Sequence, residues 1–159
     1  MVDRSNNMTP DQKQTCYCHL VQLLRDTSCL LNLTYIVHWN VMGNKFYSIH
    51  KLTKKIYEEM QDGLDVIAEH IRSMDIKTPT TVEDLNNSLM IPLPDNCFDQ
   101  DGMIATLATN YNNMAASFEL LAEEAEVLQD QLTLDLAVER GRACKKHQWL
   151  LKSNLTVDL

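Results

Sequence analysis

Two carboxylates and two imidazoles have the types and spacing that could do chemistry in this sequence. Asp65 and Glu69 are four residues apart, so on a helix they project side by side and can chelate one hard cation. His38 and His50 flank Gly43, and a tight turn there would bring both imidazoles to one end of a helical hairpin. Taken singly, each pair also fits a solvated helix face or structural histidines.

The distance between the two pairs decides how they could form one site. Fifteen residues of helix from His50 to Asp65 span about 22 Å, whereas ligands lie about 2 Å from a metal. One chain therefore cannot close the site. A second copy of the helix, antiparallel about a two-fold axis near residues 57–59, would place the carboxylates of one chain beside the histidines of the other. The sequence thus predicts a dimer interface with two equivalent metal sites.

A metal centre inside one subunit is excluded by what the sequence lacks. Helical bundles that hold two irons in their core use Glu residues and Glu-x-x-His pairs. No glutamate in this sequence is followed three residues later by a histidine. Any iron site must therefore be assembled differently.

Apolar residues spaced three and four apart predict four long helices, over about residues 10–40, 46–74, 104–128 and 133–152. A short helix over residues 81–85 is expected in the long connection between the second and third helices. Thr9 and Thr133 are the expected N-caps of the first and last helices. Two short connections and one long crossover predict an all-α, ferritin-like four-helix bundle with a short extra helix in the crossover.

The second and fourth long helices have clearly predicted faces. On the second, a polar face lies opposite the apolar stripe and consists of His50, Lys54, Tyr57, Gln61, Asp65 and Glu69. On the fourth, the residues expected to point inward are Leu134, Ala137, Gly141, Cys144 and Leu151.

Composition and charge limit the classes of function. With 45% apolar residues, the 159 residues can form one domain over 1–159, and we expect a flexible tail over 1–8 and a short tail over 153–159. The net charge is -8, and residues 78–139 contain no Lys or Arg, which disfavours nucleic acid. No segment resembles a membrane span or a signal sequence, and the five cysteines form no CxxC pair. We therefore expect a cytoplasmic protein with reduced thiols.

Three segments of the sequence resemble the Dps family of mini-ferritins. The first runs from His38-Trp39-Asn40-Val41-Met42-Gly43-Asn44-Lys45-Phe46 through His50, and the second is Asp65-Val66-Ile67-Ala68-Glu69. The third lies in the last helix, at residues 130–136 and 146–149, so the resemblance covers essentially the whole domain. It implies a hollow dodecamer that acts as a ferroxidase, oxidising Fe²⁺ preferably with hydrogen peroxide. Storage of the ferric product would protect against oxidative stress.

The resemblance also implies roles for individual residues. By position, His38 and His50 match the histidine ligands of the family, and Asp65 and Glu69 match the carboxylates given by the partner subunit. Iron, as Fe²⁺ and Fe³⁺, is the metal expected at this site, and Zn²⁺ is a possible competitor. Trp39 beside the site is expected to pack, with electron donation as an added role.

Two further features bear on iron handling. Asp130 and Asp135 match acidic residues that line the three-fold entry pore of the family, and both also fit helix-start acids favoured by the macrodipole. Many members have an aspartate four residues after the second histidine, where it helps hold a second iron. This chain has Lys54 there, and an ammonium repels a cation.

Two other functions remain open from the sequence. A structural bundle with a vestigial metal site is kept open by Lys54. A DNA-compacting nucleoid protein is disfavoured, because the segment before His19 offers only Arg4 and Lys13 in place of a lysine-rich tail. We expect no appreciable DNA binding at physiological salt.

Overall fold

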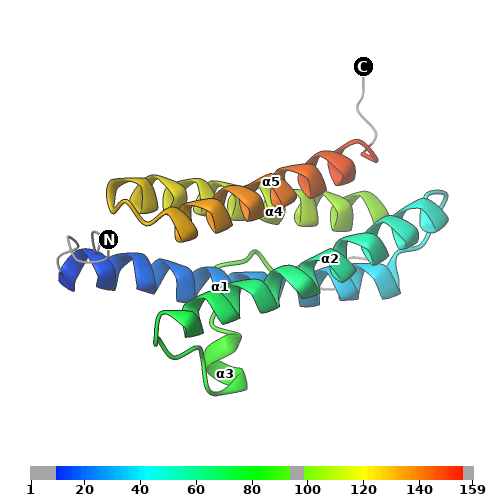
Figure 1. Ribbon diagram of the computed structural model, residues 1–159. Coiled ribbons are helices and arrows are strands. Elements are labelled where there is room, and N and C mark those ends of the chain that lie inside the picture. The colour runs from blue at the N-terminus through cyan, green and yellow to red at the C-terminus, as the bar shows by residue number, and fades with distance from the viewer. Residues whose placement is uncertain (1–9, 94–98, 156–159) are drawn as a thin grey trace.

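The computed structural model describes residues 10–93 and 99–155. Its helices, in chain order, are α1 (Pro10–Asn40), α2 (Phe46–Ser73), α3 (Val82–Leu85), α4 (Gln100–Val127) and α5 (Gln131–Lys152). The α1–α2 hairpin forms one layer and the α4–α5 hairpin another, and α3 projects from the first layer on the side away from α4 and α5 (Figure 1). The predicted all-α bundle with a short helix in its crossover is confirmed.

The turn between α1 and α2 is held by contacts to the first residues of α4 and to the segment that follows α5. Gly43 has φ +107, a conformation that side chains rarely adopt. The backbone N–H of Lys45 donates to Oε1 of Gln100 over 3.1 Å. The ammonium of Lys45 lies 3.1 Å from Asp101 and also donates to the carbonyl of Asn154. These contacts set the end of the hairpin at which the two histidines lie.

The crossover between α2 and α4 follows a defined path although most of it is irregular. Buried Asp26 accepts from the hydroxyl of Ser88 and the N–H of Leu89, both over 2.8 Å. Buried Asn110 accepts from the N–H of Ile91 over 2.9 Å and donates to its carbonyl over 2.8 Å. Buried side chains thus satisfy backbone groups of the crossover and hold it against the bundle.

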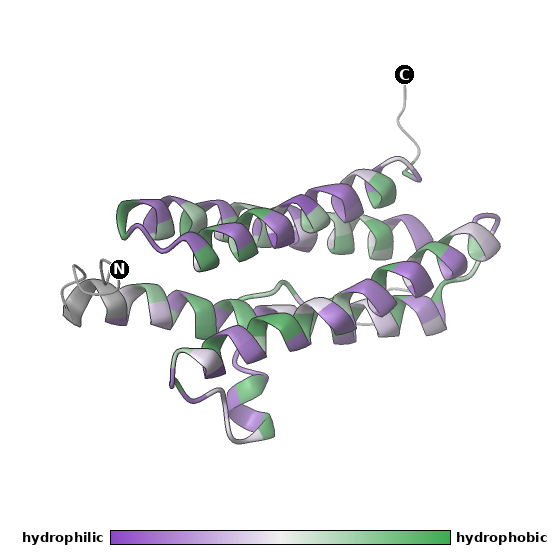
Figure 2. Cartoon of the chain, viewed as in Figure 1, coloured by the Kyte–Doolittle hydropathy of each residue, from purple (hydrophilic) through white to green (hydrophobic). Residues whose placement is uncertain are grey.

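Hydrophobic and hydrophilic residues alternate along each long helix, as amphipathic packing requires (Figure 2). The apolar residues spaced three and four apart in the predicted third helix, from Ile104 to Ala125, are buried in α4. The start of α5 is a correction, because its N-cap is Asp130 rather than Thr133. Asp130 accepts from both the N–H and the hydroxyl of Thr133, at 3.1 and 2.6 Å. Leu134, predicted to point inward, is only half-buried, and Leu136 is buried on the core face.

Some expectations concern residues outside the described ranges. The tail over 1–8, the N-cap at Thr9, Cys97 and residues 156–159 lie there. The four cysteines within the described ranges are free thiols: Cys16, Cys18, Cys29 and Cys144. None of the described helices combines the length and the hydropathy that crossing a membrane requires.

Candidate metal centre

His38 and His50 form a stacked pair beside the α1–α2 turn. Their ring centroids are 3.8 Å apart, with 18° between the planes. Nδ1 of His38 lies 2.9 Å from the carbonyl oxygen of His50, and Nδ1 of His50 lies 2.8 Å from that of His38. A carbonyl can only accept, so each Nδ1 carries a proton and donates it. In the neutral rings, both Nε2 lone pairs are therefore available to a metal.

Three neighbouring side chains hold this pair in place, a role that the sequence did not indicate for them. The hydroxyl of Thr53 lies 3.0 Å from Nδ1 of His38. The ring of Tyr57 meets His38 edge-on at 5.2 Å, and Phe46 stacks on His50 at 5.2 Å. Phe46, Thr53 and Tyr57 lie four residues before, three after and seven after His50, so they share its face of α2. This spacing is the sequence signal that could have indicated them.

Burial prepares His38 to act as a ligand. The residue is 8% exposed, and this burial lowers the pKa of His38 below its ordinary value. The neighbouring His50 lowers it further, because two imidazolium charges would repel. His38 therefore stays neutral to a lower pH than an exposed histidine would.

The two carboxylates lie at the other end of the same helix face. Asp65 and Glu69 are exposed and one turn apart on α2. Because His50 lies in the same continuous helix, Asp65 is about 22 Å away from it along the axis. Within residues 10–93 and 99–155, no three His, Cys, Asp or Glu side chains gather closely enough to hold a metal. Each chain thus presents two separate groups of candidate ligands, here called half-sites.

The charge of α2 changes sign along its exposed face. The first half carries the exposed lysines Lys51, Lys54 and Lys55. The exposed acids Glu58, Asp62, Asp65 and Glu69 follow these lysines along the helix, and the exposed Arg72 lies at its end. Lys54 lies 3.6 Å from Glu58 in an ion pair whose side chains are both more than half exposed, so the pair contributes little to stability. An antiparallel second copy of α2 would place these three lysines opposite residues 60–68, the segment that carries Asp62 and Asp65.

The other predicted residues are placed as follows. Trp39 is 67% exposed and stacks on Tyr35 at 5.6 Å, so it is not part of the subunit core. Asp130 uses both carboxylate oxygens to accept from Thr133, as a helix cap does. Asp135 accepts from the amide of Gln131 over 2.8 Å.

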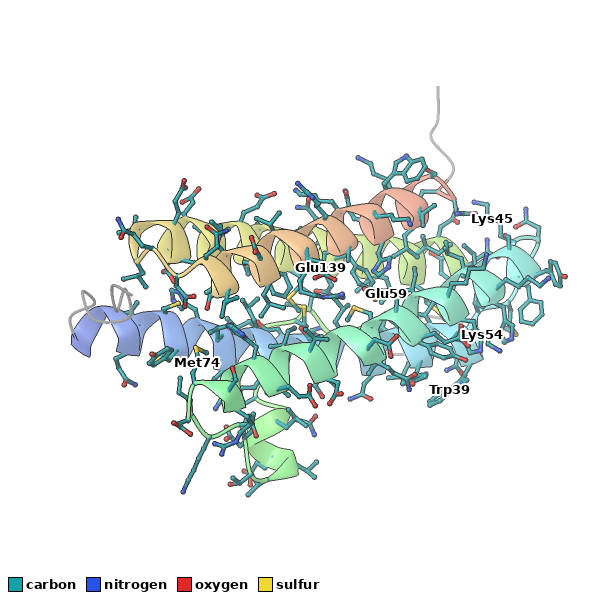
Figure 3. The ribbon with its side chains drawn as sticks, viewed as in Figure 1. Trp39, Lys45, Lys54, Glu59, Met74 and Glu139 are labelled. Carbon is teal, nitrogen blue, oxygen red and sulfur yellow. The ribbon has the colours of Figure 1, made fainter. Side chains whose placement is uncertain are left out.

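The centre of the bundle holds an ionic cluster without the Glu-x-x-His pattern. Arg140, which is 5% exposed, donates to Glu59 over 2.5 Å, and Nε2 of His147 lies 3.5 Å from the same carboxylate. Glu59 points into the space between the two layers (Figure 3). Burial lowers the pKa of His147 to about 4, because the effect of burial is larger than the opposing attraction of Glu59. His147 is therefore neutral at pH 7. The carboxylate is therefore paired with the guanidinium.

Acid should destabilise the protein partly through His147. Below pH 6.5 an unfolded histidine binds a proton that buried His147 takes up only near pH 4, so stability falls as the pH drops through this window. The full effect is roughly 3 kcal/mol. We expect His147→Gln to lose less stability than the natural protein between pH 7 and pH 4.5, by urea unfolding at fixed protein concentration. Equal losses would contradict this, because every carboxylate is common to both proteins.

Comparison with known proteins agrees with this architecture. The ferritin family, described as a ferritin-like domain, matches residues 18–158. The chain belongs to this family. A DNA protection during starvation protein from Helicobacter pylori is 26% identical over 137 residues, which is 86% of this chain and 95% of the relative. DNA protection during starvation protein 2 from Bacillus anthracis is 26% identical, and the match covers 82% of this chain and 89% of the Bacillus anthracis protein.

Solved Dps structures share the fold of this ferritin-like chain. Dps from Thermosynechococcus elongatus superposes with a TM-score of 0.87 at 21% identity, covering 92% of this chain and 94% of its own. A Dps protein from Vibrio cholerae is described as a member of a broad superfamily of ferritin-like diiron-carboxylate proteins. It superposes with a TM-score of 0.82 at 21% identity, and the match covers 96% of this chain and 98% of the Vibrio cholerae chain. The predicted resemblance to Dps proteins is confirmed.

Proposed function

We propose that this protein is an iron-storage and detoxification ferroxidase whose metal centre forms between two subunits. Fe²⁺ is the substrate, hydrogen peroxide or O₂ is the oxidant, and the ferric product is stored inside a hollow homo-oligomeric shell, expected to be a dodecamer. One observation carries the proposal. A histidine pair with available Nε2 atoms, one from α1 and one from α2, lies near the start of α2, and a pair of exposed carboxylates lies about 22 Å further along α2.

The residues of the two half-sites fit the chemistry of ferrous iron. Imidazole nitrogens of His38 and His50, with carboxylates of Asp65 and Glu69 from a second copy, suit Fe²⁺ and leave coordination positions for the oxidant. Two Fe²⁺ ions give one electron each to one hydrogen peroxide; with two waters, this yields two FeOOH and four protons. As an added role, Trp39, next to His38 in the chain, would give one electron to a hydroxyl radical formed at the centre, which becomes hydroxide and leaves the indole as a radical cation.

An acidic groove supports a route by which iron could enter. It lies at the turn between α4 and α5, and its lining includes Glu126 and Asp130. Asp135 is exposed on α5, directly after Leu134, the last residue that lines the groove. We propose that these acids attract Fe²⁺ toward the interior of the assembly.

One experiment tests oxidation and storage together. Fe²⁺ and then hydrogen peroxide are added to metal-free protein, which is passed over a gel-filtration column. We expect soluble ferric iron to elute with a large shell. If the iron precipitates or elutes separately while the shell persists, the bundle is structural and the proposed activity is wrong.

Lys54 should limit each centre to weak binding of a second iron. Its ammonium lies one turn after His50 and repels a second cation. We expect Lys54→Asp to increase the number of Fe²⁺ ions bound per centre, measured by anaerobic titration calorimetry. Lys55→Asp is the matched control, because it makes the same charge change one position further around α2. An unchanged stoichiometry in Lys54→Asp would contradict the role given to this lysine.

A further inference from the structure

A groove opens between α1, α2 and the crossover, on the side of the subunit that carries the half-sites. It has a volume of about 460 Å³, and its apolar walls are formed by Leu24, Leu31, Leu64, Ala68, Pro79 and Leu85. Gln61 and Asp65 complete the α2 side of the lining. The groove therefore adjoins one of the carboxylates of the proposed iron site.

Trp39 is an unburied aromatic side chain at the opposite end of this face. It projects from the α1–α2 layer on the side away from α4 and α5, the side from which α3 also projects (Figure 3). Its ring is 67% exposed but is held nearly parallel to that of Tyr35, with 16° between the planes. A large apolar ring whose orientation is already restrained loses little entropy when it docks.

The register of an antiparallel pair brings Trp39 to the groove. Nδ1 of His38 contacts both the carbonyl of His50 and the hydroxyl of Thr53, so Trp39, the next residue, lies level with residues 50–53 along α2. A two-fold axis that sets His50 opposite Asp65 also sets Thr53 opposite residue 62 of the second copy. An axis that sets His50 opposite Glu69 sets Thr53 opposite residue 66. Both positions fall within the α2 side of the groove, which spans residues 61–68.

We propose that Trp39 of each chain docks into this groove on a second copy of the same chain. The two-fold relation fills both grooves at once, and the lysines of α2, placed opposite the segment that carries Asp62 and Asp65, favour the same antiparallel pairing. The proposal rests on the inter-subunit centre proposed above. Trp39 is then a positioning residue, because its docking sets the register that brings Asp65 to the histidines.

Tryptophan fluorescence tests the docking directly. The chain has two tryptophans, so Trp149→Phe leaves Trp39 as the one tryptophan, which is excited at wavelengths where the tyrosines do not absorb. In the assembled, metal-free variant we expect emission shifted to the blue and acrylamide quenching several-fold weaker than for free N-acetyltryptophanamide. Emission and quenching typical of solvent-exposed indole, in a sample that gel filtration shows to be assembled, would overturn the proposal.

Filling the groove provides an independent test. Ala68→Phe places a ring in the groove and should weaken assembly, measured by sedimentation velocity. Adding Trp39→Ala to it should restore assembly, because the introduced ring then takes the place of the indole. Ala116→Phe, at an exposed position of α4, is the matched control and should leave assembly unchanged. Failure of Trp39→Ala to restore assembly would contradict the proposal.

Both tests use metal-free protein, so their outcome is separate from that of the proposed activity. If Trp39 is buried in the assembly but iron is not oxidised, the docking is right and the ferroxidase proposal is wrong. If iron is oxidised while Trp39 stays exposed, the ferroxidase proposal is right and the docking proposal is wrong.

Discussion

Replacing Gly63 by alanine should destabilise the subunit by roughly 2–4 kcal/mol, although the same change in most helices is stabilising by about 1 kcal/mol. A Cβ at position 63 would overlap the guanidinium of Arg140. Arg140 is buried and reaches Glu59 across this glycine, so the added methyl would separate the ion pair. A buried guanidinium that loses its carboxylate keeps the cost of its desolvation without the compensating attraction.

Two further variants separate this effect from a general intolerance of side chains in the core. Gly141→Ala is the matched control, because its Cβ would lie 3.4 Å from Cβ of Phe118 in ordinary contact. We expect a change within about 1 kcal/mol for Gly141→Ala, by urea unfolding. In an Arg140→Met background, Gly63→Ala should cost much less than in the natural protein. An equal cost in both backgrounds would contradict the role assigned to the ion pair.

Removing the two carboxylate charges should abolish most of the iron oxidation and leave the fold intact. Both side chains are exposed, so the double variant Asp65→Asn, Glu69→Gln should change the free energy of unfolding by only about 0.5 kcal/mol. Loss of a residue that merely orients a ligand costs about 10- to 100-fold in metal affinity or activity, and loss of direct ligands should cost at least that much. The initial rate of ferric absorbance growth after peroxide addition measures the effect.

A matched control uses acids of the same helix that lie outside the proposed centre. Asp62→Asn and Glu58→Gln remove two exposed charges from α2 without touching the ligand set. Their rate should stay close to that of the natural protein. If both double variants slowed oxidation equally, the effect would come from the general acidity of the surface.

Much of the fold and of the half-sites could be predicted from the sequence because helical periodicity is a local property. The stripe of α4 and the polar face of α2 depend on spacing alone, and Gly43 marks the turn that brings His38 to His50. The sequence predicts the start of α5 too late, because Asp130 and Thr133 are both good caps and the geometry of the turn selects between them.

The contacts that no local pattern carries could not be predicted. Arg140 and Glu59 are 81 positions apart, and their pairing depends on how α2 and α5 face each other. His38 and His50 each donate a hydrogen bond from Nδ1 to the backbone carbonyl of the other, and these two bonds depend on the geometry of the turn. Packing of Trp39 is predicted from its place beside the site, but 67% of the residue is exposed among the described residues of the subunit.

Mixed shells test the central claim, that each iron centre takes ligands from two subunits. A His38→Ala, His50→Ala variant and the Asp65→Asn, Glu69→Gln variant are each expected to be inactive alone. Co-expressed in equal amounts and purified as mixed assemblies, they should recover about a quarter of the natural activity, because half of the dimers are mixed and each has one intact centre. Activity no higher than that of the separate variants would contradict an inter-subunit centre.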